Sequence, residues 1–495
     1  MSVVNVGTRS LLLTQSLVGM RTQLGDLQRQ LATGKRADNY AGIGIDRGLT
    51  VGLRSHLSSI SSYNDTITSV KVRLELAQTV LSRVSAAGRE TKAVAAEMTS
   101  VDGRATAQAS ATSALGEMLG LLNTQAGDRF LFSGLASDKP SVDTLSHILD
   151  GDGARAGLKQ IVAERLQADL GATGLGRVEV TSPSPTSVAV GEESPATVFG
   201  FKLVGISSSL SGSTVMSPAG VPPQQMSVDL GATNPVAGES VRLSFSLPDG
   251  STETITLTAT STTPPGVGEF LIGADSTETA ANLQSALSTK IGSLARTALS
   301  AASALAASGN FFAEPPQRVA GPPFDTATGL VAGTATDTVM WYTGESGSQP
   351  ARATAMAKVD QSISVQYGTR ANEEGIRWQL QQVAALAAIS MTSTDPDSSG
   401  RGAALSTRLR ALLDVPLGTQ SIEQIQSELA GAQTSLGAAE KRHQQTKATL
   451  GNLLQEIEGV SNEEVAAQIL ALQTSLQASL QTTAKLFQTS ILNYL

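Results

Sequence analysis

Apolar and small residues recur at alternating steps of three and four from Ser421 to Val460. They are Ile422, Ile425, Leu429, Ala432, Leu436, Ala439, Leu450, Leu453, Ile457 and Val460. His443 and Thr446 fill the two remaining places, and a register-setting or exposed role is favoured for the histidine. This spacing keeps a narrow seam on one face of a helix, which is buried by packing against another helix. At about 1.5 Å per residue the helix is about 60 Å long, so the pattern predicts an equally long partner.

The N-terminal part of the chain carries a second seam with the same spacing. Its members are Leu13, Leu17, Met20, Leu24, Leu27 and Leu31. The pattern predicts a helix over residues 1–33 that ends at Gly34, because glycine accepts the positive φ of a helix C-cap. A glycine-rich loop is expected at 39–48, followed by a longer periodic helix that extends to about residue 124. Both ends of the chain are therefore predicted to be long helices.

The middle of the chain is richer in Gly, Pro, Ser and Thr, with short β-branched runs. Residues 240–247 and 252–259 flank Pro248-Asp249-Gly250 and predict a β-hairpin, since glycine tolerates the positive φ of the turn. The other elements expected here are strands at 338–342 and 363–367 and helices at 276–307, 372–391 and 405–413. Residues 135–400 are therefore predicted to form an α+β insertion.

A helix boundary is expected near Ser461, which is followed three residues later by Glu464 as in a capping box. The seam then resumes out of register at Val465, Ile469, Leu472, Leu476 and Leu480. This shift predicts a joint between two helices or a stutter within one. The last apolar residues, Leu486, Ile491, Leu492 and Leu495, are expected to be buried in this molecule or in a neighbour.

The predicted fold is mainly α, with long antiparallel N- and C-terminal coiled-coil helices and an inserted α+β outer domain. Its expected divisions are an inner-core helix at 1–45, a helical stalk at 46–134, the outer insertion at 135–400, a second stalk at 401–460 and a C-terminal inner-core helix at 461–495. The candidate functional site is an assembly interface on the terminal helices. Its residues are Leu13, Leu17, Met20, Leu24, Leu27, Leu31, Leu472, Leu476, Leu486, Ile491, Leu492 and Leu495.

Composition and charge exclude several classes of protein. The net charge of −8 gives no attraction to phosphate backbones, so nucleic-acid binding is disfavoured. No apolar run approaches the roughly 20 residues that cross a bilayer, and the N-terminus lacks the pattern of a cleavable secretory signal. Absence of cysteine removes disulfides and thiolate metal sites. Aromatic residues make up only 3% of the chain, so its helices depend on aliphatic and small-residue seams.

Motifs that could carry chemistry are weak. Residues 42–48, Gly-Ile-Gly-Ile-Asp-Arg-Gly, resemble a dinucleotide-binding loop but have the wrong last spacing and no preceding strand. Asp150-Gly151-Asp152-Gly153 begins like a calcium loop but lacks the later acidic ligand. The three histidines are isolated in sequence, and no nucleophile motif occurs. No enzyme, cofactor or metal site is therefore expected.

The two ends of the chain resemble a known family. The segment Gln30-Leu-Ala-Thr-Gly-Lys-Arg36, followed by Ala41-Gly-Ile-Gly-Ile45, is similar to the signature after the first helix of bacterial flagellins. Residues 476–495 resemble the terminal helix of the same superfamily. The resemblance covers about residues 1–134 and 401–495.

Two branches of this superfamily remain open. Residues 127–134, Gly-Asp-Arg-Phe-Leu-Phe-Ser-Gly, are similar to the G-x-Y-x-F-x-G motif of hook–filament junction proteins, the hook-associated protein 3 type. The segments 342–345 and 365–373 also resemble that branch. The total length and the size of the insertion are closer to a filament flagellin. The motifs therefore favour the junction, whereas the length favours the filament.

The resemblance implies a structural subunit of the bacterial flagellum that polymerises through its terminal helices. Its implied partners are further copies of itself, neighbouring axial proteins such as hook-associated proteins and flagellin, and an export chaperone. Its implied location is extracellular, reached through flagellar type III export without a cleaved signal peptide. The alternatives are a secreted coiled-coil adhesin or export-needle component, and an enzyme housed in the insertion, for which the sequence has no motif.

Overall fold

The computed structural model describes residues 3–98, 100–412 and 418–492, which form two compact units. Unit 1 consists of Met1–Val70, Ala357–Val365 and Thr434–Leu495, and unit 2 of Lys71–Met356 and Gln366–Gln433. Two long helices, α2 (Arg47–Ala95) and α10 (Ile422–Glu458), contribute to both units.

Unit 1 contains the two ends of the chain. Helix α1 (Val3–Thr33) confirms the predicted N-terminal helix, and it ends at Gly34, whose φ is +65°. The expected loop at 39–48 is wrong in detail, because Tyr40–Asp46 forms a 3₁₀ helix whose first turn is capped by the side chain of Asn39. Helix α11 (Asn462–Leu492) begins just after α10 ends, so the register shift near Ser461 marks a joint between two helices.

The seam of α10 is buried over most of its predicted length. Its fully or nearly buried members are Ile422, Ile425, Leu429, Ala432, Leu436, Ala439 and His443. Beyond them Thr446 is exposed and the side chain of Leu453 is 42% exposed, which corrects that part of the seam. Leu454 is half-buried in place of Leu453, so the buried face of α10 is shifted by one residue between Leu450 and Ile457.

One long helix to residue 124 was expected, whereas the structure has two helices. Helix α2 ends at Ala95 and α3 (Val101–Leu122) begins after Ser100, whose Oγ accepts the amide N–H of Gly103 at 2.9 Å. Arg83 on α2 forms an ion pair with Glu117 on α3, so the two helices run antiparallel in unit 2. A serine cap therefore breaks an otherwise uniform alanine-rich pattern.

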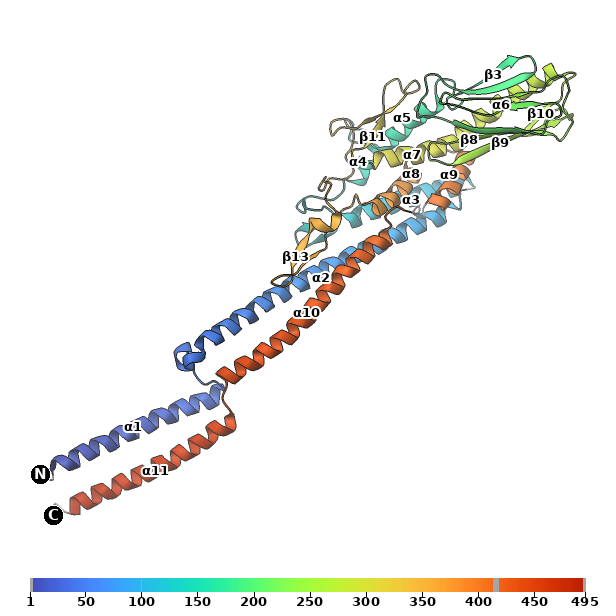
Figure 1. Cartoon of the computed structure of the whole chain (residues 1–495). Coiled ribbons are helices and arrows are strands. Elements are labelled where there is room, and N and C mark those ends of the chain that lie inside the picture. Colours follow the sequence, from blue (N-terminus) through green and yellow to red (C-terminus); the bar gives the residue numbers. More distant parts are fainter. Residues whose placement is uncertain (1–2, 99, 413–417, 493–495) are drawn as a thin grey trace. The chain divides into compact units, whose positions relative to one another are not determined.

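The strand-rich part of unit 2 contains two four-stranded sheets, visible around β3 and β8 in Figure 1. The first has the order β3-β4-β7-β6 and is antiparallel, with strands Val178–Ser184, Ser187–Glu192, Gln225–Asp229 and Thr214–Met216. The second has the order β10-β9-β8-β5, with strands Glu269–Leu271, Thr252–Thr260, Ser240–Ser246 and Lys202–Ser208. The pairing of Ser246 with Thr252 confirms the predicted hairpin, and Gly250 in its turn has a φ of +80°.

One continuous helical run covers these sheets. It consists of α6 (Ser276–Leu294), a π-helical turn at Ala295–Leu299 and α7 (Ser300–Phe311), as the apolar pattern over 276–307 predicted. Its side chains Leu283, Leu287 and Ile291 share a core cluster with Val188 and Met226 of the first sheet and with Phe245 and Phe270 of the second. The insertion therefore has its own hydrophobic core.

The remaining elements of unit 2 are short. They are β1 (Gln125–Ala126), β2 (Arg129–Phe130), α4 (Leu145–Asp150), α5 (Leu158–Leu170), β11 (Gln317–Val319), β12 (Leu330–Ala332), a 3₁₀ turn at Ala351–Thr354, α8 (Glu374–Ala388) and α9 (Ser398–Leu412). Helix α8 lies within the range predicted at 372–391, whereas α9 begins seven residues before the predicted 405.

The expected strand at 338–342 is wrong. Thr338 and Tyr342 form isolated bridges to two different segments, at Ala156 and Val142, so no continuous ladder arises. The strand expected at 363–367 is present as β14 (Ser364–Gln366), which pairs with β13 (Met356–Lys358). The chain is thus mainly α, with long antiparallel terminal helices and an inserted α+β region.

Candidate assembly surface

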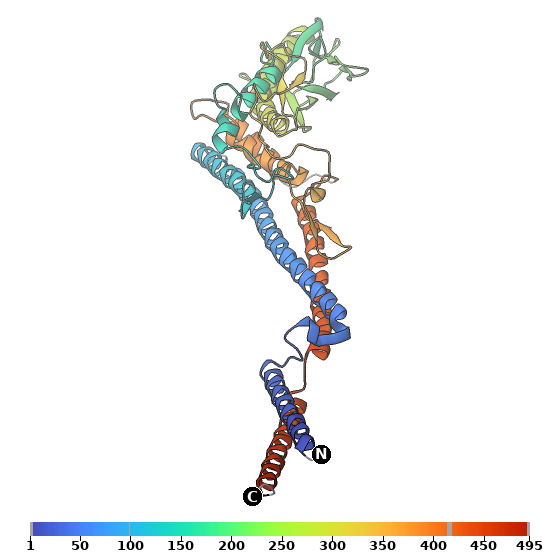
Figure 2. The same ribbon diagram turned by 90° about the vertical axis from the view of Figure 1, so that its left-hand side faces the viewer.

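Helices α1 and α11 lie side by side, at the two ends of the chain (Figures 1 and 2). They run antiparallel, since α1 enters the joint near Lys35 and α11 leaves it near Ser461. Each helix has only this one long neighbour within the described part of unit 1. A two-helix pair of this kind buries one stripe of each helix and leaves the rest of its surface in water.

The predicted seam of α1 faces its partner only in part. Leu13, Leu17, Met20, Leu24 and Leu27 are all half-buried. The side chain of Leu31 is 40% exposed, so it is the least covered of the predicted interface residues on α1. A single helix neighbour therefore leaves the seam incompletely shielded.

The seam of α11 is better covered near the joint. Val465, Ile469 and Leu476 are 4%, 9% and 8% exposed, and Leu472 is half-buried. Farther along, Leu480 is 47% exposed. Among the predicted interface residues, Leu486, Ile491 and Leu492 have helical backbone but side chains outside the described part, and Leu495 lies outside the described residues altogether.

Several apolar side chains of these helices that lie off the seam are strongly exposed. Leu11, Leu12 and Val18 on α1 are 72%, 66% and 59% exposed, and Leu470 on α11 is 64% exposed. They are not among the residues of the predicted interface. The run of three leucines at 11–13 was the sequence feature that could have identified them, because it makes an apolar arc wider than a two-helix seam needs.

A groove of about 440 Å³ lies between the two helices. It is lined by Gln23, Asp26, Leu27, Gln30, Gln468, Ala471, Leu472 and Ser475. Leu27 and Leu472 are both predicted interface residues, so the structure brings these two together. The groove combines apolar and amide side chains, as a surface that packs against another helix would.

The joint, formed by residues 34–36 and 458–461, connects the two chain segments where α1 ends and α11 begins. Two backbone hydrogen bonds link these segments, from Arg36 N to Glu458 O at 2.7 Å and from Val460 N to Gly34 O at 3.2 Å. The guanidinium of Arg54 donates to both carboxylate oxygens of Glu458, at 3.0 and 2.6 Å. Glu458 is 11% exposed in its side chain, so this bidentate pair is partly desolvated. Sequence reasoning missed it, because the two residues are 404 positions apart.

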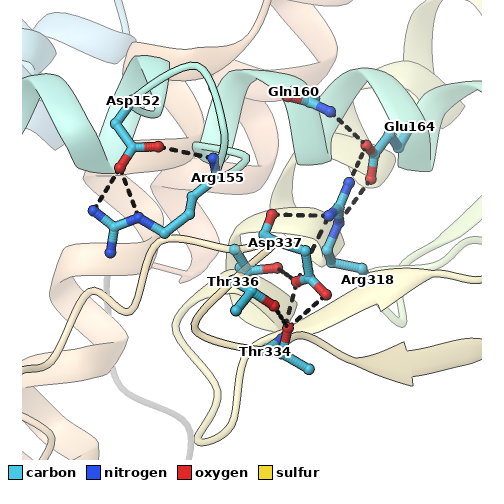
Figure 3. A network of polar contacts seen from close by, with 9 residues as sticks. Asp152, Arg155, Gln160, Glu164, Arg318, Thr334, Thr336 and Asp337 are labelled. Carbon is cyan, nitrogen blue, oxygen red and sulfur yellow. Dashed lines mark hydrogen bonds and ion pairs between the residues drawn. The ribbon is translucent and has the colours of Figure 1, made fainter.

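Charged groups in unit 2 are engaged with one another. Figure 3 shows Glu164 accepting from the side chains of Arg318 and Gln160, while Asp337 accepts from Thr334. Hydrogen bonds from the hydroxyl of Thr338 and from Thr334 lower the pKa of Asp337. These contacts tie α5 to the segment around β11 and β12, which is a structural role.

Over residues 3–98, 100–412 and 418–492 no group of three or more His, Asp or Glu side chains is arranged to hold a metal ion. In the same part of the chain no helix has the length and apolar character needed to cross a membrane.

Comparison with known protein families finds a match in the N-terminal part of the chain. Residues 4–137 match the model for the bacterial flagellin N-terminal helical region. No curated protein matches the chain. The matched segment contains nearly all of α1, together with α2, α3 and the β1–β2 hairpin. Over residues 4–137 the chain is therefore similar to the N-terminal helical region of bacterial flagellins, as the resemblance of its N-terminal segment implied.

Proposed function

We propose that the protein is a structural subunit of the flagellar axis that polymerises through α1 and α11. The observation that supports this most directly is the exposure of large apolar side chains on both helices, with Leu11, Leu12, Val18 and Leu470 each more than half exposed. Large apolar side chains that are exposed on both helices of one pair are typical of a contact with another protein.

Polymer formation follows from the energetics of these helices. A neighbouring copy that covers the exposed side chains gains about 25 cal/mol per Å² of apolar surface buried. That gain offsets the cost of ordering the terminal helices, about 1–2 kcal/mol per residue. Contacts between different faces of identical subunits do not close on themselves, so the expected product is a helical polymer.

The proposed partners follow from the same role. They are further copies of the chain, neighbouring axial proteins and an export chaperone that covers the terminal helices before assembly. The proposed location is extracellular, on the bacterial flagellum. We also propose that the predicted divisions at 1–45, 46–134, 135–400, 401–460 and 461–495 correspond to inner core, stalk, outer insertion, stalk and inner core.

Deletion of Thr483–Leu495 tests the proposal. The truncated protein should keep the circular dichroism and thermal unfolding of unit 2, because unit 2 has its own core. It should fail to form sedimentable filaments under conditions in which the full chain forms them. Normal filaments from the truncated chain would refute the role of α11 and favour the alternative of a secreted coiled-coil adhesin or export-needle component.

The position of the subunit along the flagellum is a separate question. An epitope inserted at the exposed residue Val221, in the strand-rich part, can be located on cells by immunogold electron microscopy. Labelling along the whole filament would identify a filament flagellin. Labelling only at the distal end of the hook would identify a junction protein, as the motifs at 127–134 and 365–373 favour.

A further inference from the structure

A β-hairpin that is distant in sequence from α2 and α10 belongs to unit 1. Residues 357–365 contain parts of β13 and β14, and they cluster with the helical segments Met1–Val70 and Thr434–Leu495. Ala357, Val359 and Val365 are 4%, 0% and 7% exposed, so the hairpin is held by an apolar contact. Its turn is closed by backbone hydrogen bonds from Val359 N and Asp360 N to Ile363 O, at 2.9 and 3.2 Å.

His443, on the seam of α10, lies next to this hairpin. Its side chain is 5% exposed, and its ring stacks on Tyr63 of α2 with centroids 5.9 Å apart. Nδ1 is 2.9 Å from Oδ1 of Asn64. An amide oxygen only accepts hydrogen bonds, so Nδ1 carries a proton and donates it.

The other ring nitrogen of His443, Nε2, lacks a comparable hydrogen bond among the described residues. In a neutral imidazole whose Nδ1 is protonated, Nε2 is an acceptor. Nε2 of His443 is buried and has no hydrogen-bond partner within the described residues. The nearest acidic group is the Asp360 carboxylate at the hairpin turn, with Oδ2 3.7 Å away. Two acceptors thus face each other while the histidine is neutral, whereas an imidazolium would donate from Nε2 to this carboxylate.

Other charged groups surround this pair. From α10, Arg442 places NH2 3.8 Å from the same Oδ2 of Asp360, and Glu440 and Lys447 lie within about one turn of His443 in sequence. From α2, His56 and Tyr63 line the same cleft of about 340 Å³, to which the hairpin contributes Asp360 and Gln361. Histidine is the side chain that ordinarily changes charge between about pH 5 and 8, and His443 is the histidine that lies against Asp360.

We propose that His443 and Asp360 form a pH-dependent latch that fastens the 357–365 hairpin to the α2–α10 helix pair. At neutral pH the hairpin is held by its apolar contact and by Arg442. When pH falls through the histidine range, Nε2 gains a proton and donates a charge-assisted hydrogen bond to Asp360. Because only the docked hairpin places a carboxylate beside Nε2, protonation and docking stabilise each other. The latch therefore closes on acidification and opens as pH rises.

Hydrogen exchange of the full-length protein at about pH 5.5 and about pH 7.5, corrected for intrinsic rates, tests the latch. Peptides that contain Val359 and Asp360 should be about tenfold more protected at the lower pH, the size of one charge-assisted hydrogen bond. Asp360→Asn should abolish this difference, and it leaves the buried seam of α10 unchanged. His443→Gln should abolish it as well.

His56→Gln is the matched control, because His56 lines the same cleft and has no hydrogen bond or ion pair to Asp360 in the described structure. This variant should keep the wild-type difference. A wild-type protein without extra protection at low pH, or an Asp360→Asn variant that retains it, would overturn the latch. If His443→Gln does not fold, the Asp360→Asn result alone decides.

Discussion

The joint between the two helix pairs of unit 1 contains Glu458, whose side chain is 11% exposed. Arg54→Met removes both hydrogen bonds to its carboxylate, which would remain largely buried without a cation. Since Arg54 is itself 45% exposed, the expected loss is modest, about 1–2 kcal/mol. Opening of the joint should then speed the exchange of the Arg36 and Val460 amides about tenfold.

An arginine that is exposed and lacks such a partner provides the comparison. Arg47→Met removes the same charge at the start of α2 and should leave both amide rates unchanged. Equal effects of the two substitutions would mean that the Arg54–Glu458 pair does not hold the joint.

We expect Asp337 to contribute to the acid sensitivity of unit 2. Hydrogen bonds from the Thr338 hydroxyl and from Thr334 lower its pKa below the ordinary 3.8, so it contributes stability above that pH. The contribution is lost as pH falls through the lowered pKa of the folded state. Asp337→Asn should therefore flatten the decline in thermal stability below pH 3.8, whereas Asp138→Asn, at an exposed site, should leave it unchanged. An unaltered acid profile in Asp337→Asn would contradict this assignment.

At the scale of elements, local patterns predicted the structure where structure is local. The seams of α1, α10 and α11 and the turn at Asp249-Gly250 are set by residues close in sequence, and all four elements were predicted. The strand predicted at 338–342 is absent because the bridges of this segment are formed with Ala156 and Val142, which are about 200 positions away.

The candidate surface was predictable to a similar extent. Periodicity identified Leu27 and Leu472, which line one groove. It missed Leu12 and Val18, because a seam defines what faces the partner helix and not what remains exposed. It also could not pair Arg54 with Glu458, since no local pattern connects residues so far apart.

Helix α10 offers a test of how burial decides the effect of a leucine. Leu436 is fully buried, so Leu436→Ala should destabilise unit 1 by about 2–5 kcal/mol, through lost burial and the cavity left behind. Leu453→Ala removes the same atoms from a side chain that is 42% exposed and should cost much less. Hydrogen exchange of α10 amides between these positions measures both. Comparable losses would show that the exposed half of the helix is packed in solution.

At the scale of the whole molecule, the two ends of the chain form a pair that is incomplete by itself. Unit 2 buries a large core of its own, whereas α1 and α11 share one half-buried seam and expose leucines on their other faces. Such a division suits a subunit that folds its insertion alone and completes its terminal helices only in contact with other copies.

Leu12 tests this division directly, because it is 66% exposed and so contributes little to the isolated chain. Leu12→Asp should leave the thermal unfolding of the monomer within about 0.5 kcal/mol of wild type, as surface substitutions usually do. In a polymer that covers this position it would bury an unpaired carboxylate, which costs several kcal/mol and should abolish assembly measured by sedimentation and electron microscopy. Leu12→Met keeps the volume and the apolar character, so it should assemble normally. If Leu12→Asp assembles as well as Leu12→Met, the exposed face of α1 remains in water in the polymer, and assembly must use another surface of the chain.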